Sequence, residues 1–555
     1  MVARERLAAR STISIRLGEQ IASLFARMSI VAIPRAEGVK SHARHENGIS
    51  PRAADRVAGP AASWMPLLAA VILLPFANGG QSIALAAWLA PLFLLRFTRT
   101  HRRSVALPVS LLVQAVAFAI QFRGMIPFVP IAQATVILFY AFVFTAPYIG
   151  DNLAMLRLRG FSRSLVFPLV WSAIEFLVSF GPFGSWCTVP YSQYGNLALL
   201  QILAVTGLCG ITFLIGWTAS AGNALWEERA FVPRVPPVTI ACATLMVVVL
   251  LAGSTRLALF PPLAKTVRIA SLSKLDVALH PDTQVLQRFD HHESLDSGEI
   301  KTIRERAAVI ADDLLVRTGS EARAGARIVF WGEGNARVLK EDEADLIRRG
   351  RTLAQSNGIY LGMTLASWHL EATPHLENKI VLIQPDGTSA WEFFKAHPVP
   401  GREAAISIRS DGKMRILETP YGRLSAAICF DADFPRLLAQ AGRLQADIVL
   451  DPSNDWKAID PWHTRMASFR AIEQGFNLVR HTSHGLSAAF DYQGRQLATM
   501  DHFAADNRVL VAQVPTSGAR TLYSICGDWF GWFCVGSLSI LLLGFLGSKR
   551  EPDRV

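Results

Sequence analysis

Long apolar runs separated by short polar connections dominate residues 63–256, and one further apolar run occupies 529–547. A helix needs roughly 20 predominantly apolar residues to cross a bilayer core about 30 Å thick. The runs therefore predict a membrane domain of seven helices and, much later in the chain, a C-terminal transmembrane helix. The predicted spans are Trp64–Ala77, Ser82–Leu95, Val105–Phe122, Ile126–Tyr148, Leu165–Phe180, Leu197–Trp217, Val238–Ala252 and Phe530–Leu546.

The basic residues predict how these spans are oriented. Arg is frequent before the first span and in every second connection between spans, and Lys549 and Arg550 follow the last span. Lys and Arg gather at the cytoplasmic ends of membrane helices. We therefore expect a basic, disordered cytoplasmic leader over 1–62, a cytoplasmic tail over 548–555, and a large domain on the opposite side of the membrane.

Charge and composition argue against two other classes of protein. The net charge is +11, but the basic residues lie in the leader and beside apolar runs, a pattern of membrane topology and not of nucleic-acid binding. Charged residues make up 18% of the chain, below the usual share of about 25%, and the deficit falls in the apolar regions. One such run would fit a buried helix of a soluble protein, but seven in succession do not.

Residues 266–515 follow a linker over 257–265 and alternate between strand-like and helix-like segments. Several consecutive strands have no helix between them, so we expect antiparallel pairing alongside βαβ units. The predicted strands are Val267–Ser273, Arg327–Trp331, Tyr360–Thr364, Lys379–Gln384, Leu424–Phe430, Asp447–Asp451, Leu478–Arg480 and Gly485–Asp491. The predicted helices are Glu299–Val316, Pro435–Leu444 and His463–Gly475.

Three reactive side chains stand at the ends of predicted strands in this domain. Glu333 lies between two glycines, Lys395 ends an aromatic segment, and Cys429 is the one cysteine deep inside the soluble part. A carboxylate can transfer protons, an ammonium can stabilise an oxyanion, and a thiol served by a base is a nucleophile. Each residue alone also fits a structural role: a turn-capping Glu, a surface Lys or an inert core Cys.

Other polar residues predict less. The six cysteines are scattered and form no CxxC pair, so neither a disulfide framework nor a zinc site is expected. The run Asp290–Glu293 contains two His residues but is typical of a solvated segment. A Cys–His pair with His397, His481 or His484 has no support in the residues around Cys429. Glu175 lies within the fifth predicted span, where a carboxylate is costly unless it is paired or functional.

The order of Glu333, Lys395 and Cys429, each at a strand end, resembles the nitrilase (carbon–nitrogen hydrolase) superfamily. One branch of that superfamily, the apolipoprotein N-acyltransferases, has seven spans before the catalytic domain and one after it, as predicted here. The segments that resemble this branch or the superfamily are Phe167–Trp171 with Glu175, Ile428–Asp431, Phe434–Pro435, Asp451–Trp456, Met466–Glu473 and Arg480–Gly485.

The resemblance implies an αββα nitrilase-like sandwich outside a multi-span α-helical membrane domain, in the inner membrane of a bacterium with the catalytic domain on the periplasmic face. It implies that Cys429 attacks a phospholipid acyl ester, Glu333 moves protons, and Lys395 with the Phe430 amide holds the oxyanion. The acceptor would be the N-terminal amine of a diacylglyceryl apolipoprotein. Glu403 and Asp431 would support the site, without cofactor or metal.

Position relative to the membrane also suggests that Trp456 and Trp462 line the path of the acyl chain. The sequence departs from the family where Gly332 replaces a usual Pro and Phe430-Asp431 replaces Tyr-Glu. The second departure is closer to soluble hydrolases, so a membrane-tethered amidase or nitrilase that acts on a small substrate is an alternative. A non-catalytic lipid-binding scaffold is a third, and the intact Glu, Lys and Cys argue against it. The residues predict no oligomeric state.

Overall fold

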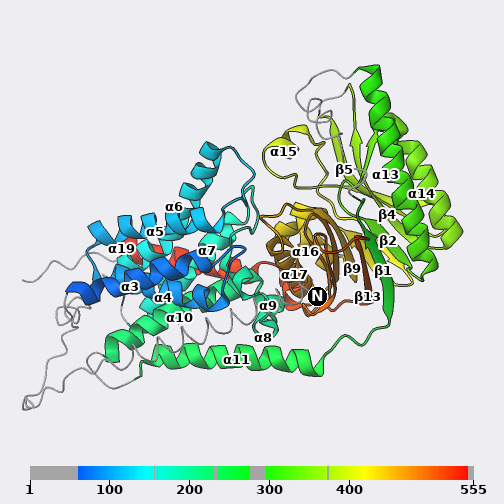
Figure 1. Ribbon diagram of the computed structural model, residues 1–555. Coiled ribbons are helices and arrows are strands. Elements are labelled where there is room, and N and C mark those ends of the chain that lie inside the picture. The colour runs from blue at the N-terminus through cyan, green and yellow to red at the C-terminus, as the bar shows by residue number, and fades with distance from the viewer. Residues whose placement is uncertain are drawn as a thin grey trace, which may run out of the picture. The chain divides into compact units, whose positions relative to one another are not determined.

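The computed structural model describes residues 60–155, 157–158, 160–229, 235–275, 296–371 and 374–547. The predicted tail, the run Asp290–Glu293 and all but the last three residues of the predicted leader lie outside these ranges. The described part contains a set of long helices and a β-sandwich (Figure 1).

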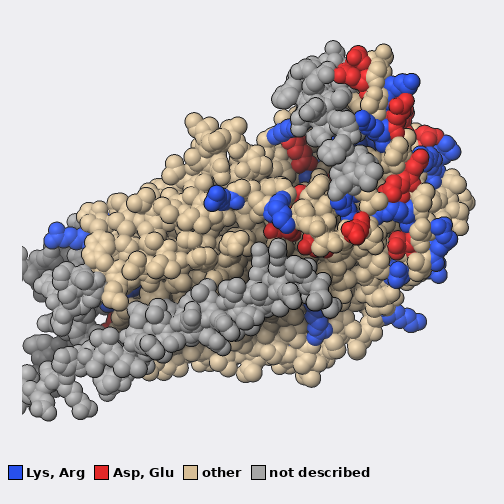
Figure 2. All heavy atoms as spheres, in the orientation of Figure 1, with Lys and Arg blue, Asp and Glu red and all other residues tan. Residues whose placement is uncertain are grey.

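The apolar runs form helices, which confirms a multi-span membrane domain. These are α3 (Pro60–Leu73), α4 (Ala84–Thr100), α5 (Arg103–Gln121), α6 (Pro130–Ala154), α7 (Gly160–Val178), α10 (Leu208–Arg229), α11 (Pro237–Leu259) and α19 (Trp529–Gly547). Five described helices, α5, α6, α7, α10 and α11, are long and apolar enough to cross a membrane. On the visible face, Figure 2 shows few charged side chains over these helices and many over the sandwich.

The sixth predicted span is wrong in its first half. Residues 197–206 form two short helices, α8 (Leu197–Leu200) and α9 (Leu203–Thr206), and a continuous helix begins only at Leu208. Gly207 makes the break with a φ of +62°, and a Cβ there would lie 2.5 Å from the Tyr523 ring. Gln201 donates to the Gln493 carbonyl, so this apolar segment packs against the sandwich. Apolar composition alone does not separate such packing from contact with lipid.

Two mixed sheets form the sandwich. The first has the order β13-β1-β2-β4-β5-β6, with β3 paired to β4, and the second the order β12-β11-β10-β9-β8-β7. Parallel pairs such as β1–β2 and antiparallel pairs such as β4–β5 occur in the same sheet, as expected. The strands of the first sheet are β1 (Thr266–Leu272), β2 (Ile328–Trp331), β3 (Ala336–Leu339), β4 (Tyr360–Trp368), β5 (Leu376–Ile383), β6 (Ser389–Phe394) and β13 (Val509–Pro515). Those of the second are β7 (Leu417–Thr419), β8 (Gly422–Ala426), β9 (Ile448–Asn454), β10 (Asn477–Ser483), β11 (Leu486–Phe490) and β12 (Gln496–Asp501).

Helices cover the outer faces of both sheets. Helices α13 (Ser297–Arg323) and α14 (Glu343–Asn357) lie along the first sheet (Figure 1). They bury an apolar stripe against it, with Leu314 and Leu346 in the same cluster as Val329. Helices α16 (Pro435–Arg443) and α17 (Trp462–Gln474) pack on the second sheet. This arrangement confirms the αββα sandwich. Helix α14 was not among the predicted elements.

A loop of the sandwich reaches into the helix bundle and fixes where the site lies. The Trp456 indole N–H donates to the Gly124 carbonyl in the loop between α5 and α6, at 2.9 Å. Ile459 is fully buried in one apolar cluster with Phe122 and Tyr140 of that helix pair. Residues that follow β9 and residues of the membrane domain therefore share one apolar interior.

Candidate active site

Cys429 stands at a sharp turn between the second sheet and α16. Strand β8 ends at Ala426, and a short 3-10 helix, η5 (Cys429–Asp433), begins at the cysteine. The predicted strand over Leu424–Phe430 is wrong at its end because Cys429 has a φ of +54°, which turns the chain out of the sheet. The thiol is 3% exposed, and its Sγ lies 3.9 Å from the Asn454 carbonyl oxygen.

Glu333 and Lys395 form a buried ion pair on the neighbouring sheet. Lys395 Nζ lies 2.7 Å from Glu333 Oε1 and 2.8 Å from Glu403 Oε1. The Asn378 amide donates to the same two carboxylates, at 2.8 Å and 3.1 Å. Glu333 comes just after β2 and Lys395 just after β6, whereas Asn378 lies within β5. One cation thus faces two carboxylates at one edge of the sandwich.

Asp431 joins this cluster to the turn at Cys429. It accepts hydrogen bonds from the backbone amides of Ile428 at 3.1 Å and His397 at 2.7 Å. The first bond fixes the turn before Cys429, and the second fixes the loop after Lys395. The His397 ring stacks on Phe434 with 3.6 Å between ring centroids. A carboxylate at this position therefore sets the spacing between the cysteine and the lysine.

The structure explains why a glycine, Gly332, precedes Glu333. The Gly332 amide donates to the Leu272 carbonyl at 2.9 Å, a bond that a proline could not make. A Cβ at this position would also lie 2.5 Å from the side-chain nitrogen of Asn335. The departure from the family's usual Pro therefore fits the packing around this turn and leaves Glu333 in place.

Burial and charge set the protonation states of this group. Burial raises the pKa of the Cys429 thiol well above its usual value, and the Glu333 carboxylate adds to this, while Lys395 opposes it. Burial alone would lower the pKa of Lys395, but the carboxylates of Glu333 and Glu403 raise it well above its usual value. At neutral pH the site therefore holds a thiol and an ammonium, and the thiol needs a base before it can attack.

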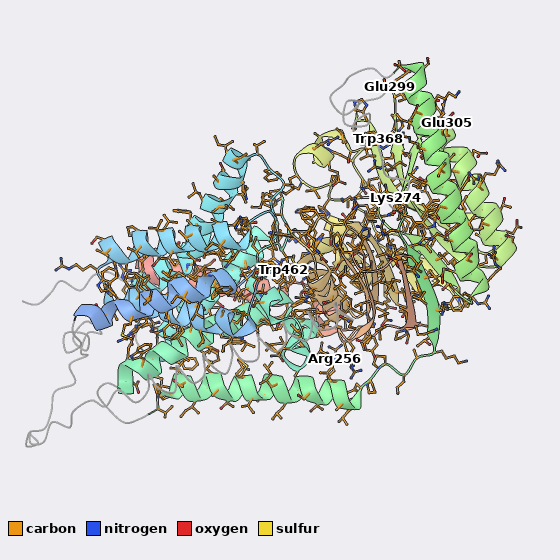
Figure 3. The ribbon with its side chains drawn as sticks, in the orientation of Figure 1. Arg256, Lys274, Glu299, Glu305, Trp368 and Trp462 are labelled. Carbon is orange, nitrogen blue, oxygen red and sulfur yellow. The ribbon has the colours of Figure 1, made fainter. Side chains whose placement is uncertain are left out.

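All three side chains line one cavity of about 490 Å³, together with Glu403, Phe430 and Trp456. Its other wall is apolar and comes from the membrane domain: Phe122, Met125, Ile126, Phe128, Tyr140 and Trp186. Trp462 does not line this cavity. Trp462, labelled in Figure 3, is 3% exposed at the start of α17. Its ring packs against that of Tyr191. The cavity can hold a long apolar group with one end beside the thiol.

A second buried charge network behind the thiol was missed in the sequence. Arg480 of β10 pairs with Asp451 of β9 and with Asp455, and Asp455 also pairs with His463 of α17. Atoms of Cys429, Asp455 and His463 lie within 4.8 Å of one another, as metal ligands can. The Arg480 guanidinium, however, contacts Asp455, where it would repel a metal cation. A charged residue such as Arg480 inside an apolar strand is the sequence signal that could have indicated this network.

The stability of this network is expected to depend on pH. Burial alone would lower the pKa of His463, but Asp455 and Asp433 raise it to about 9. A His pKa raised from about 6.5 to about 9 contributes about 3 kcal/mol below pH 6.5, and this is lost as the pH rises through 9. Thermal unfolding in detergent from pH 6 to pH 10 should therefore show a falling midpoint in the wild type and a smaller fall in His463→Gln. Equal slopes for the two proteins would contradict the assignment.

The remaining candidates from the sequence have other partners. His481 bonds to the hydroxyls of Ser271 and Ser273, and burial lowers its pKa to about 3, so it stays neutral. His484 contacts the Asn454 side chain. These hydrogen bonds of His481 and His484 therefore do not involve Cys429, and His397 contacts Asp431. Glu175 is paired, as a carboxylate in a span requires: it accepts from Trp171, Val189 and Thr212.

Comparison with known proteins gives two family matches in separate parts of the chain. Residues 68–221 match the family described as the apolipoprotein N-acyltransferase N-terminal domain, and residues 320–523 match the carbon-nitrogen hydrolase family. An apolipoprotein N-acyltransferase of Geobacter metallireducens is 27% identical over 69% of this chain and 74% of its own length. Apolipoprotein N-acyltransferase 2 of Treponema pallidum is 25% identical over 84% of this chain and 91% of its own length. A solved amidase from Nesterenkonia sp. is 18% identical and covers 46% of this chain and 92% of that chain, with a TM-score of 0.36.

Proposed function

Because this chain belongs to the apolipoprotein N-acyltransferase family, the membrane branch of the carbon–nitrogen hydrolases, we propose that it passes an acyl chain from a phospholipid through a Cys429 thioester to an apolipoprotein. The acceptor is the N-terminal amine of a diacylglyceryl-Cys residue. One observation carries the proposal: Glu333, Lys395 and Cys429 line a single cavity whose opposite wall is an apolar surface of the membrane domain.

The first half-reaction loads the enzyme. The Glu333 carboxylate accepts the Cys429 thiol proton while Sγ attacks the ester carbonyl carbon of the phospholipid. The Lys395 ammonium and the Phe430 amide stabilise the resulting oxyanion. When the oxyanion collapses, the C–O bond to glycerol breaks, the alkoxide takes the proton from Glu333, and a lysophospholipid leaves. The acyl chain remains as a thioester on Cys429.

The second half-reaction transfers the acyl group from Cys429 to the lipoprotein. The neutral amine of the lipoprotein attacks the thioester carbon, and Glu333 accepts a proton from the nitrogen. Lys395 again faces the oxyanion. The C–S bond then breaks, an amide is released, and the Cys429 sulfur recovers the proton. Throughout the reaction Glu403 holds the Lys395 ammonium in place, and the Asn378 amide donates to Glu333 and so orients its carboxylate.

The apolar wall supports a long acyl chain as the transferred group. Residues of the α5–α6 loop, among them Phe128, and the indole of Trp456 would contact it. In this proposal the membrane domain comprises 63–256 and the catalytic domain 266–515, with the linker over 257–265 between them and the C-terminal helix over 529–547 after. The alternation of basic connections supports an inner-membrane protein with the catalytic domain in the periplasm.

The second candidate is a membrane-tethered carbon–nitrogen hydrolase, which the Phe430-Asp431 pair favours. The two functions differ in acceptor. Purified protein incubated with phospholipid and a diacylglyceryl-Cys peptide is expected to give the N-acylated peptide, and the same protein with small aliphatic amides should release no ammonia above background. Ammonia release without peptide acylation would overturn the acyltransferase and favour the hydrolase.

A further inference from the structure

A single buried ion pair encloses the peptide backbone of Cys429. Asp451 Oδ1 accepts the Cys429 backbone N–H at 3.0 Å, and Arg480 Nη1 donates to the Cys429 carbonyl at 3.3 Å. Arg480 Nη1 also donates to Asp451 Oδ2, at 2.5 Å. The pair therefore closes a ring through both polar backbone groups of this one residue. Asp451 and Arg480 are both 0% exposed.

The guanidinium of Arg480 is itself fixed from the other side. Its Nη2 donates to Asp455 Oδ1 at 3.3 Å, and its Nε donates to the Thr464 hydroxyl at 3.2 Å. These partners come from the segment after β9 and from α17, while Arg480 belongs to β10. Because contacts from several elements hold the planar guanidinium of Arg480, this group has a single orientation.

The conformation of Cys429 needs such a restraint. Its φ of +54° lies in the left-handed region, which side chains other than glycine rarely adopt and which persists only where the surroundings fix it. The consequence for chemistry is also specific. Because the Cys429 N–H already bonds to Asp451, that amide is not available to an oxyanion, which agrees with the proposed use of the Phe430 amide instead.

We propose that Arg480 and Asp451 are positioning residues that hold the Cys429 peptide in its left-handed turn and so aim the sulfur into the cavity. This inference rests on the proposed role of Cys429 as nucleophile. Neither residue lines the cavity, so neither contacts the acyl group or the acceptor. Their loss should therefore change the rate of the step at sulfur and leave the binding of the phospholipid unchanged.

We call the Asp451–Arg480 pair around the Cys429 peptide the clamp. The rate at which Cys429 reacts with iodoacetamide tests the clamp without any acyl substrate. The rate is measured by mass spectrometry on the peptide that contains Cys429, in the full-length protein in detergent. The variants are Arg480→Lys, which keeps the charge but loses the fork, and Asp451→Asn, which keeps an acceptor but loses the ion pair. The matched control is Arg470→Lys, because Arg470 is also 0% exposed and paired, with Glu473, but does not contact Cys429.

Both clamp variants are expected to alkylate at least about tenfold more slowly than wild type, with the control within about twofold, because thiol reactivity depends on access and a released Cys429 sulfur would no longer point into the cavity. Where acyl transfer is measured, kcat should fall and KM for phospholipid should stay. If single variants do not fold, the double variant Asp451→Leu/Arg480→Met replaces the whole pair by apolar side chains, which proteins often tolerate. It should also alkylate slowly.

Folded clamp variants with wild-type alkylation rates, or a control slowed as much as they are, would overturn the clamp. Absence of acyl transfer in the wild-type protein, with slow alkylation in the variants, would instead overturn the proposed function and leave the clamp in place. The two failures are therefore distinguishable in one set of proteins.

Discussion

Cys429→Ala is expected to abolish N-acylation of a diacylglyceryl-Cys peptide, with a loss of at least about 10⁴-fold, because removal of a covalent nucleophile removes both half-reactions. Cys429→Ser should be equally inactive. A serine hydroxyl is far less acidic than a thiol, and the Glu333 carboxylate is too weak a base to activate it. The measurement is initial velocity at saturating phospholipid, with folded protein confirmed by thermal unfolding.

The control for this loss is Cys534→Ala. Cys534 is also fully buried, but it lies in α19 and packs against Leu169 and Ala173, away from the cavity. This variant should keep wild-type velocity within about threefold, as expected for a small apolar change away from a site. Turnover in Cys429→Ala at a level near that of Cys534→Ala would refute the nucleophile.

Glu333→Gln is expected to lower kcat by about 10²- to 10⁴-fold, the usual contribution of a general base. Glutamine keeps an oxygen for the Asn378 amide, and Lys395 keeps its contacts with Glu403, so the cluster should stay folded. What is lost is the ability to accept the proton of Cys429 and to return it to the leaving group. KM for phospholipid should change little, because the apolar wall is untouched.

Glu343→Gln provides a closely matched comparison. Glu343 is 7% exposed and lies 2.8 Å from the Lys379 ammonium, much as Glu333 is 8% exposed and lies 2.7 Å from that of Lys395. It is not among the residues that line the cavity. Loss of this second pair should lower the unfolding temperature and leave kcat within about threefold, as for a buried pair outside a site. Equal losses of kcat in both variants would show that Glu333 has only a structural role.

The hydrophobic pattern predicted the two-part architecture because membrane spans and half-buried strands impose strong periodicities. It did not separate residues 197–206 from a span, since the same apolar side chains suit lipid and the sandwich surface. It also continued a strand through Phe430, because Ala426–Phe430 is uniformly apolar and nothing local marks the positive φ at Cys429. Helix α14 was not predicted, although it has an apolar stripe that includes Leu346 opposite a charged face.

For the site, the sequence identified Glu333, Lys395 and Cys429 through their order and contexts, and the structure places all three on one cavity. Glu403 also contacts Lys395, and Asp431 accepts from the backbone amides of Ile428 and His397, whereas Trp462 lies elsewhere. The network of Arg480, Asp451 and His463 was not predicted because its members are far apart in sequence, and the charge of Arg480 inside an apolar strand does not by itself identify its partners. Only the packing of β9, β10 and α17 brings their charges together.

In the proposed reaction Cys429 carries the acyl group between donor and acceptor. Full-length protein incubated with phospholipid of one defined acyl chain, without acceptor, should be analysed by mass spectrometry after proteolysis. The peptide containing Cys429 is expected to gain the mass of that acyl group and to lose it when a diacylglyceryl-Cys peptide is added. An unmodified Cys429 peptide, in protein that nevertheless acylates the acceptor, would contradict it.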